Sequence, residues 1–130
     1  MKHYIDGFVL PVPLDKLKTY REVVEKVAEI WKEYGALDYS EYVGDDFSLE
    51  GSLSFADVAN AKKDEAVIFG WVLFESREAR DLANERVAAD PRMADLIKPL
   101  THASRPIFDA KRMVFGGYSS LVQSSNLSAG

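Results

Sequence analysis

The 130 residues are enough for one domain, and 47% hydrophobic with 28% charged residues is ordinary globular composition, which excludes a disordered or fibrous chain. A net charge of −5 argues against nucleic acid as a partner, because that binding needs clustered lysines and arginines. The lack of cysteine excludes disulfides and thiolate sites. Without an apolar run near ~18 residues or a signal-peptide pattern, we expect a cytoplasmic protein with no membrane partner.

The first third of the chain predicts a strand, a helix and a second strand. Residues 3–12 alternate like a strand. Apolar side chains then recur at three- and four-residue steps over residues 17–34, which is the stripe of an amphipathic helix. Asp15 suits the N-cap of this helix, and Gly35 suits the left-handed position after its end. Residues 36–43 return to the alternation of a strand.

The remainder predicts two more strands and two helices. Residues 66–74 are apolar throughout, as in a buried strand. Ser76 and Asp90 are suited to cap the helices that follow them, and Pro91 fits a first helical position. The other segments are a loop (44–52), an extended segment (53–59), a loop (98–110), a last strand (111–122) and a flexible polar tail (124–130).

This order of elements predicts an α+β fold, the ferredoxin-like βαββαβ sandwich, in which two helices cover one face of an antiparallel sheet. Residues 1–123 would form this single domain. Because the strands are apolar on both faces, the second face must also be covered. We expect a second copy to cover it, giving a homodimer through the open sheet face. The alternative is that the 98–110 loop of the same chain folds over it.

Several short motifs resemble those of a family of uncharacterised bacterial proteins, the YbaA-like family, over nearly the whole chain. They are Asp6-Gly7-Phe8-Val9, Tyr20-Arg21, Gly35-Ala36-Leu37, Phe69 with Trp71, Asp90-Pro91-Arg92-Met93, Lys111-Arg112-Met113 and Gly116-Gly117. The resemblance implies a dimeric α/β barrel, in which two ferredoxin-like sheets pack face to face. Proteins of that superfamily include cofactor-independent and haem-degrading monooxygenases, small isomerases and stress-related proteins, so the fold alone does not define a function.

Four side chains within otherwise apolar strands are the candidates for a site. Asp6 and Glu41 are the candidate catalytic acid/base groups, with Asp6 expected to point away from the helices and into the barrel. Arg112 would anchor an anionic ligand, and Trp71 would form a stacking wall. The alternative is structural: Asp6 pairs with Arg112 and the pair sets strand register. A pocket acid would have a raised pKa, whereas a paired Asp6 would have a lowered one.

The sequence indicates neither a metal nor a cofactor. His3 and His102 are far apart, and there is no short-spaced histidine pair, nucleophile elbow or phosphate-binding glycine loop. Two functions remain open. One is a small-molecule-binding protein or a cofactor-independent, monooxygenase-like enzyme. The other is a non-catalytic, structural or stress-related dimeric module without a ligand site. A cavity beside Asp6 would favour the first, and a fully packed interior would favour the second.

Overall fold

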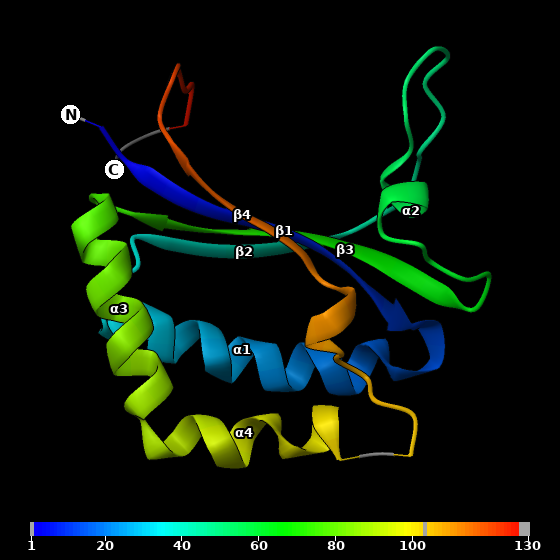
Figure 1. Ribbon diagram of the computed structural model, residues 1–130, viewed down its shortest axis with the longest axis horizontal. Coiled ribbons are helices and arrows are strands. Elements are labelled where there is room, and N and C mark those ends of the chain that lie inside the picture. Colours follow the sequence, from blue (N-terminus) through cyan, green and yellow to red (C-terminus); the bar gives the residue numbers. More distant parts are fainter. Residues whose placement is uncertain (1, 103, 128–130) are drawn as a thin grey trace.

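The computed structural model describes residues 2–102 and 104–127 and has the layout of a ferredoxin-like sandwich (Figure 1). The strands are β1 (Tyr4–Pro13), β2 (Asp38–Val43), β3 (Glu65–Phe74) and β4 (Val114–Ser119), and the helices are α1 (Leu17–Glu33), α2 (Phe55–Val58), α3 (Arg77–Ala89) and α4 (Pro91–Thr101). Neighbouring strands are antiparallel in the order β2-β3-β1-β4. The predicted α+β topology is therefore confirmed. Of the predicted tail, residues 128–130 lie outside the described residues.

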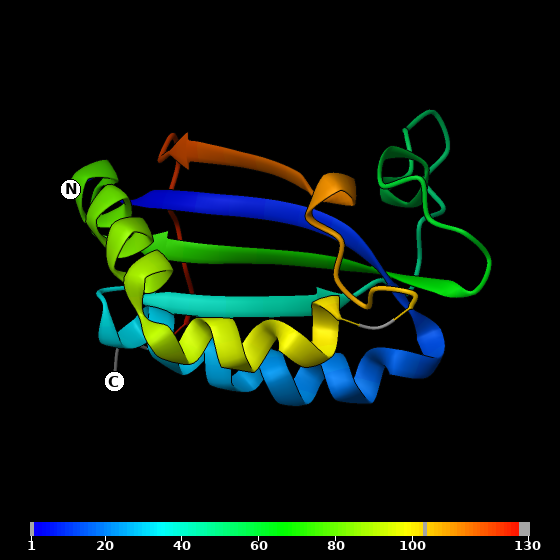
Figure 2. The same cartoon turned by 60° about the horizontal axis from the view of Figure 1, so that its bottom comes forward.

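Helices α1, α3 and α4 lie on one face of the sheet, and Figure 2 shows α4 alongside α1 in front of the strands. Because side chains alternate along a strand, the even-numbered residues of β1 and β3 face these helices. The largest fully buried side chains belong to this set: Leu10, Val12, Ile68 and Phe74. They pack with the apolar stripe of α1, so the helix predicted from three- and four-residue steps is placed by the burial of that stripe.

The opposite face of the sheet is open over most of its area. At one end the segment around α2 rises above it (Figure 1), and Ala59 closes a small buried cluster with Val9 and Val67. The predicted loop after α4 does not cover this face, because Ile107 is buried in the core on the helix side. Exposed apolar side chains on the open face are Tyr42, Phe69, Val114 and Tyr118.

The predicted helix caps of the second half are confirmed. The Ser76 hydroxyl accepts a hydrogen bond from the Ala79 N–H, and the Asp90 carboxylate accepts one from the Arg92 N–H. At the end of α1, Gly35 has a φ of +111°, the left-handed conformation that favours glycine. The N-cap predicted for α1 was wrong, because Asp15 lies in a 3₁₀ turn and Lys16 is the residue before the helix.

Three other segment predictions were wrong. Residues 53–59 are not extended, because the Ser54 side chain accepts a hydrogen bond from the Ala56 N–H and begins the one-turn helix α2. Helix α4 continues through Pro99 into the predicted loop, and this extension buries Leu100 against α1. The last strand is shorter than 111–122, because a 3₁₀ turn over Ala110–Arg112 precedes β4.

Candidate functional site: a cavity between the sheet and the helices

A cavity of about 360 Å³ lies between the sheet and the helices α1 and α4. Strands β1 to β4 line one side of it, and α1, α3, α4 and the segment before β4 line the rest. Most lining side chains are apolar, and the polar ones are Asp6, Tyr20, Tyr39, Glu41 and Asn84. An apolar hollow with a few convergent polar groups is the usual form of a small-molecule site.

A second hollow, of about 670 Å³, lies along α1 and β2 and shares Tyr20, Val24, Tyr39 and Glu41 with the first. Its rim includes the exposed side chains of Lys18 and Arg21. The two hollows therefore border the same four residues, and the outer one has exposed side chains on its rim.

Glu41 is held by two phenol groups. The Tyr39 hydroxyl donates to Glu41 Oε2 at 2.7 Å, and the Tyr20 hydroxyl donates to Oε1. Tyr39 and Glu41 share a face because they are two residues apart in β2, and Tyr20 reaches them from α1. Burial raises the pKa of Glu41, and the two hydroxyl donors oppose that effect. A partly desolvated carboxyl group with a raised pKa is suited to exchange a proton with a bound molecule.

Asp6 is the second carboxyl group of the cavity wall and forms an ion pair with Arg80. Arg80 Nη1 is 3.2 Å from Asp6 Oδ1, and the Asp6 side chain is buried while that of Arg80 is 13% exposed. The guanidinium group lies 4.9 Å from the centre of the Tyr4 ring and donates to the Tyr4 hydroxyl at 3.3 Å. Burial raises the pKa of Asp6, because it outweighs the opposing charge of Arg80. Asp6 thus has the raised pKa expected of a pocket acid, although it also has a structural partner.

The strand register fixes the spacing of the two carboxyl groups. Asp6 is opposite Val72, and Glu41 is opposite Gly70, on either side of the central strand β3. Two strand spacings of about 4.8 Å and two residues of about 3.4 Å place their Cα atoms roughly 12 Å apart. The two groups therefore border one cavity at separate points, and they do not form a carboxylate pair around one reacting atom.

The lack of a side chain at Gly70 allows Phe8 and Glu41 to approach each other in the cavity wall. A Cβ atom at this position would lie 2.4 Å from Cζ of Phe8 and 2.9 Å from Cγ of Glu41. Real Cβ contacts are never that short, so only glycine lets the Phe8 ring and the Glu41 side chain lie side by side over β3. The Phe8 ring is thereby placed next to the Glu41 side chain.

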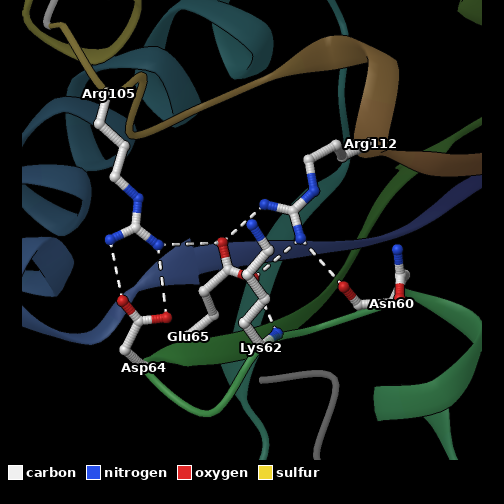
Figure 3. Close-up of polar contacts among 6 residues, drawn as sticks. All are labelled: Asn60, Lys62, Asp64, Glu65, Arg105 and Arg112. Atoms are coloured by element: carbon white, nitrogen blue, oxygen red, sulfur yellow. Dashed lines mark hydrogen bonds and ion pairs between the residues drawn. The ribbon is translucent and has the colours of Figure 1, made fainter.

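The other two candidate residues lie outside this cavity. Trp71 is on the open face, where its Nε1 donates to Asp38 Oδ2 at 2.9 Å and its ring stacks on Tyr42 with centroids 5.3 Å apart. Arg112 binds Glu65 through two hydrogen bonds of 2.6 and 2.8 Å, and also donates to the Asn60 carbonyl (Figure 3).

The predicted Asp6–Arg112 pair and the predicted orientation of Asp6 were therefore wrong. Asp6 is opposite Gly117 in the register of β1 and β4, five residues beyond Arg112, so the two side chains are at opposite ends of the strand pair. Asp6 and the buried Leu10 are both even-numbered residues of β1, so they lie on the same face of the sheet. Asp6 therefore faces the helices, where Arg80 of α3 forms an ion pair with it. Arg80 was not predicted, because it lies among acidic residues on a separate helix and nothing in the strand pattern connects it to Asp6.

Tyr20 and Tyr39 were also not predicted as site residues. Tyr20 was interpreted as part of the apolar stripe of its helix, and its ring is indeed buried in the core. The available signal was Tyr39 two residues before Glu41, which places a hydroxyl donor on the same strand face. Nothing in the sequence pattern indicated that the Tyr20 hydroxyl reaches the same carboxyl group from another element.

Among residues 2–102 and 104–127, no group of three or more histidine, cysteine, aspartate or glutamate side chains is placed to hold a metal ion. None of the helices in this described part of the chain is both long enough and apolar enough to span a membrane.

Comparison with known proteins agrees with the YbaA-like resemblance. A family model described as a protein of unknown function (DUF1428) matches residues 3–105. The uncharacterized protein YbaA of Escherichia coli K12 is 38% identical over 119 residues, which cover 92% of this chain and 97% of that protein.

Several solved structures share the fold at low sequence identity. A NIPSNAP family protein of unknown function from Agrobacterium tumefaciens has a TM-score of 0.51 at 17% identity, covering 98% of this chain and 92% of that one. A monooxygenase from Streptomyces coelicolor, solved with nanaomycin D, has a TM-score of 0.50 at 17% identity, covering 98% and 93%. A dimeric ferredoxin-like protein from an uncultured marine organism has a TM-score of 0.50 at 12% identity, covering 95% and 97%. At these identities the likeness shows the fold alone.

Proposed function

The chain belongs to the DUF1428 family of proteins of unknown function, and we propose that it is a homodimeric protein that binds a small, largely apolar molecule in the cavity between its sheet and its helices. As an enzyme, it would catalyse a cofactor-independent, monooxygenase-like reaction with molecular oxygen as the oxidant, in which Glu41 accepts a proton from the bound molecule. We further expect the protein to act in the cytoplasm, on its composition alone.

The observation that carries the proposal is the cavity itself, with Glu41 at its polar end. Its volume of about 360 Å³ falls within the range of ordinary ligand pockets. A protein that needed only a stable core would gain by filling this space, because interiors are close-packed and a void forfeits contacts. The alternative of a non-catalytic module predicts a packed interior, so the cavity beside Asp6 favours the ligand-binding function.

We propose different roles for the two carboxyl groups. Glu41 is the acid/base group, because its partners are neutral hydroxyls and its pKa is raised by burial. Asp6 would lie beside the other end of the ligand while it remains paired with Arg80. Trp71 and Arg112 lie outside the cavity, and we assign Trp71 to the dimer contact and Arg112 to the support of the loop before β3.

Filling the cavity tests the binding function. Val24 lines both hollows from α1, so Val24→Trp should occupy the space and remove ligand binding. The measurement is a thermal-shift screen of small apolar molecules, in which a ligand at about 100 times its Kd adds roughly 2.7 kcal/mol of stability. The matched control is Lys26→Trp, which adds the same ring on the exposed side of α1. Ligands that stabilise the wild type and the Val24→Trp protein equally would contradict the proposal.

The homodimer is proposed from the open face of the sheet. Tyr42, Phe69, Trp71 and Tyr118 form an aromatic surface there, and Phe69 packs edge-on against Trp71 with centroids 5.8 Å apart. A contiguous apolar surface of this kind is uncommon on a monomer, and the same face of a second copy is complementary to it. The solved ferredoxin-like neighbour described as dimeric is consistent with this assembly.

Light scattering should therefore return about twice the chain mass of 14.6 kDa at micromolar concentration. Phe69→Glu should shift the protein to the monomer, because it buries a charge at the centre of the contact. Leu82→Glu, which changes an exposed leucine on α3 instead, should leave the dimer intact. A wild-type monomer, or a dimer that survives Phe69→Glu, would contradict the assembly without affecting the cavity.

A further inference from the structure

The charges that line the cavity are all acidic. Asp6 and Glu41 border it, and no lysine, arginine or histidine within the described residues lines it. Asp6 is matched by Arg80, so its charge is already compensated. Glu41 takes part in no ion pair within that same part of the chain, and its two hydrogen-bond donors are neutral tyrosines. One uncompensated carboxyl group therefore remains in an otherwise apolar space.

Aromatic side chains make up much of the cavity wall. Six aromatic side chains line the cavity, and they are Phe8, Tyr20, Trp31, Tyr39, Phe108 and Phe115. The Phe8 ring lies next to Glu41 over Gly70. A carboxyl group in an aromatic-lined cavity has the chemistry that recognises an organic cation, because aromatic rings can attract a positive charge over their faces and the carboxylate neutralises it.

We propose that the natural ligand is an apolar amine whose ammonium group binds Glu41, with its hydrocarbon body among the aromatic and aliphatic side chains of the cavity. This inference rests on the proposed ligand-binding function and adds the charge of the ligand to it. An ammonium group supplies the cation that Glu41 lacks, so each charge compensates the desolvation of the other. Anionic ligands are disfavoured, because no lysine, arginine or histidine among the described residues lines the cavity. Arg112 is committed to Glu65, Arg80 is paired with Asp6, and Lys18 and Arg21 lie on the exposed rim of the outer hollow.

A series of three indole compounds tests the charge preference. Tryptamine, indole-3-ethanol and indole-3-acetate share one two-ring skeleton and carry a positive, a neutral and a negative group at neutral pH. Titration calorimetry on the 130-residue protein at pH 7 should show tryptamine binding at least tenfold more tightly than indole-3-ethanol, and indole-3-acetate binding most weakly. This comparison needs no variant, so it stands even if a Glu41 substitution impairs folding.

Glu41→Gln assigns the preference to one residue. It should weaken tryptamine binding at least tenfold and leave indole-3-ethanol binding nearly unchanged. Glu22→Gln, which removes an exposed charge from α1, should leave both unchanged and controls for general attraction of a cation to an acidic protein.

The outcomes separate the two proposals. If the alcohol binds as tightly as the amine, and Val24→Trp removes both, the charge inference is overturned and the binding function stands. If tryptamine does not bind but a neutral molecule stabilises the wild type and not Val24→Trp, the charge inference is again overturned and the binding function again stands. If no molecule responds to Val24→Trp, both proposals are overturned.

Discussion

Replacing Arg80 by glutamine should lower the stability of the protein at pH 7 by about 3 kcal/mol, as expected when one partner of a buried ion pair is removed. The reason is Asp6, whose side chain is only 7% exposed and whose cationic contact is Arg80. The substitution also removes the guanidinium group from the Tyr4 ring. Chemical denaturation followed by circular dichroism measures the effect, and a decrease of roughly 10 °C in Tm should accompany it.

The pH dependence of the Arg80→Gln effect has a definite sign. Burial already raises the pKa of Asp6, and loss of the cation raises it further. A carboxyl group whose pKa is higher in the folded than in the unfolded state stabilises the fold when it is protonated. This stabilisation is fully present at pH values below the unfolded-state pKa of about 3.9, and it is lost as the pH rises through the folded-state pKa. The difference in the free energy of unfolding between the wild type and Arg80→Gln should therefore become smaller as the pH is lowered from 7 to 4. Adding Asp6→Asn should restore much of the stability at pH 7, whereas an undiminished deficit in the double variant would contradict this account.

The second large effect is expected at Glu65, which joins three segments at the start of β3 (Figure 3). Its side chain is 2% exposed and accepts hydrogen bonds from Arg112, from Arg105 and from the Lys62 N–H. Glu65→Gln should cost about 2–3 kcal/mol at pH 7, below the usual loss for a broken buried pair because Arg112 is 30% exposed and can be hydrated. Denaturant unfolding of the two proteins at equal concentration measures it.

Here the pH dependence has the opposite sign. The hydrogen bonds from Arg112 lower the pKa of Glu65 to about 2. A carboxyl group whose pKa is lower in the folded than in the unfolded state stabilises the fold when it is ionised. This stabilisation is present at pH values above the unfolded-state pKa of about 4.3, and it is lost as the pH falls towards 2. The gap between wild type and Glu65→Gln should close over that interval. Asp64→Asn is the control, because its pair with Arg105 is exposed and should contribute little. Equal losses for the two variants would show that burial of Glu65 is not the cause.

The fold could be predicted because its main signals are local. The stripe of α1, the caps at Ser76 and Asp90 and the apolar run of β3 each depend on residues close in sequence. Their order was enough for the ferredoxin-like topology. The one-turn helix α2 was missed because a four-residue helix has no periodicity to detect, and its only signal was Ser54 as a cap.

The sequence predicted the two carboxyl groups of the candidate site but not the side chains that contact them. Asp6 and Glu41 were identified because a carboxyl group within an apolar strand is unusual, and the structure brings both to one cavity. Their partners come from helices, through contacts such as Tyr20 to Glu41 and Arg80 to Asp6. The sequence of one strand does not contain that pairing, because it depends on how the helices dock over the sheet.

The cavity and the open face each contain one of the two tryptophans, Trp31 and Trp71 respectively. Their indole N–H signals in a ¹⁵N-labelled sample, assigned with Trp31→Phe and Trp71→Phe, report the two surfaces separately. Titration with unlabelled tryptamine, and in a separate sample with indole-3-ethanol, shows whether a small molecule binds between the sheet and the helices. Binding there should give a saturable shift of the Trp31 signal and leave the Trp71 signal unmoved. A shift of the Trp71 signal alone, or no saturable change in either signal with both compounds, would contradict ligand binding in the cavity.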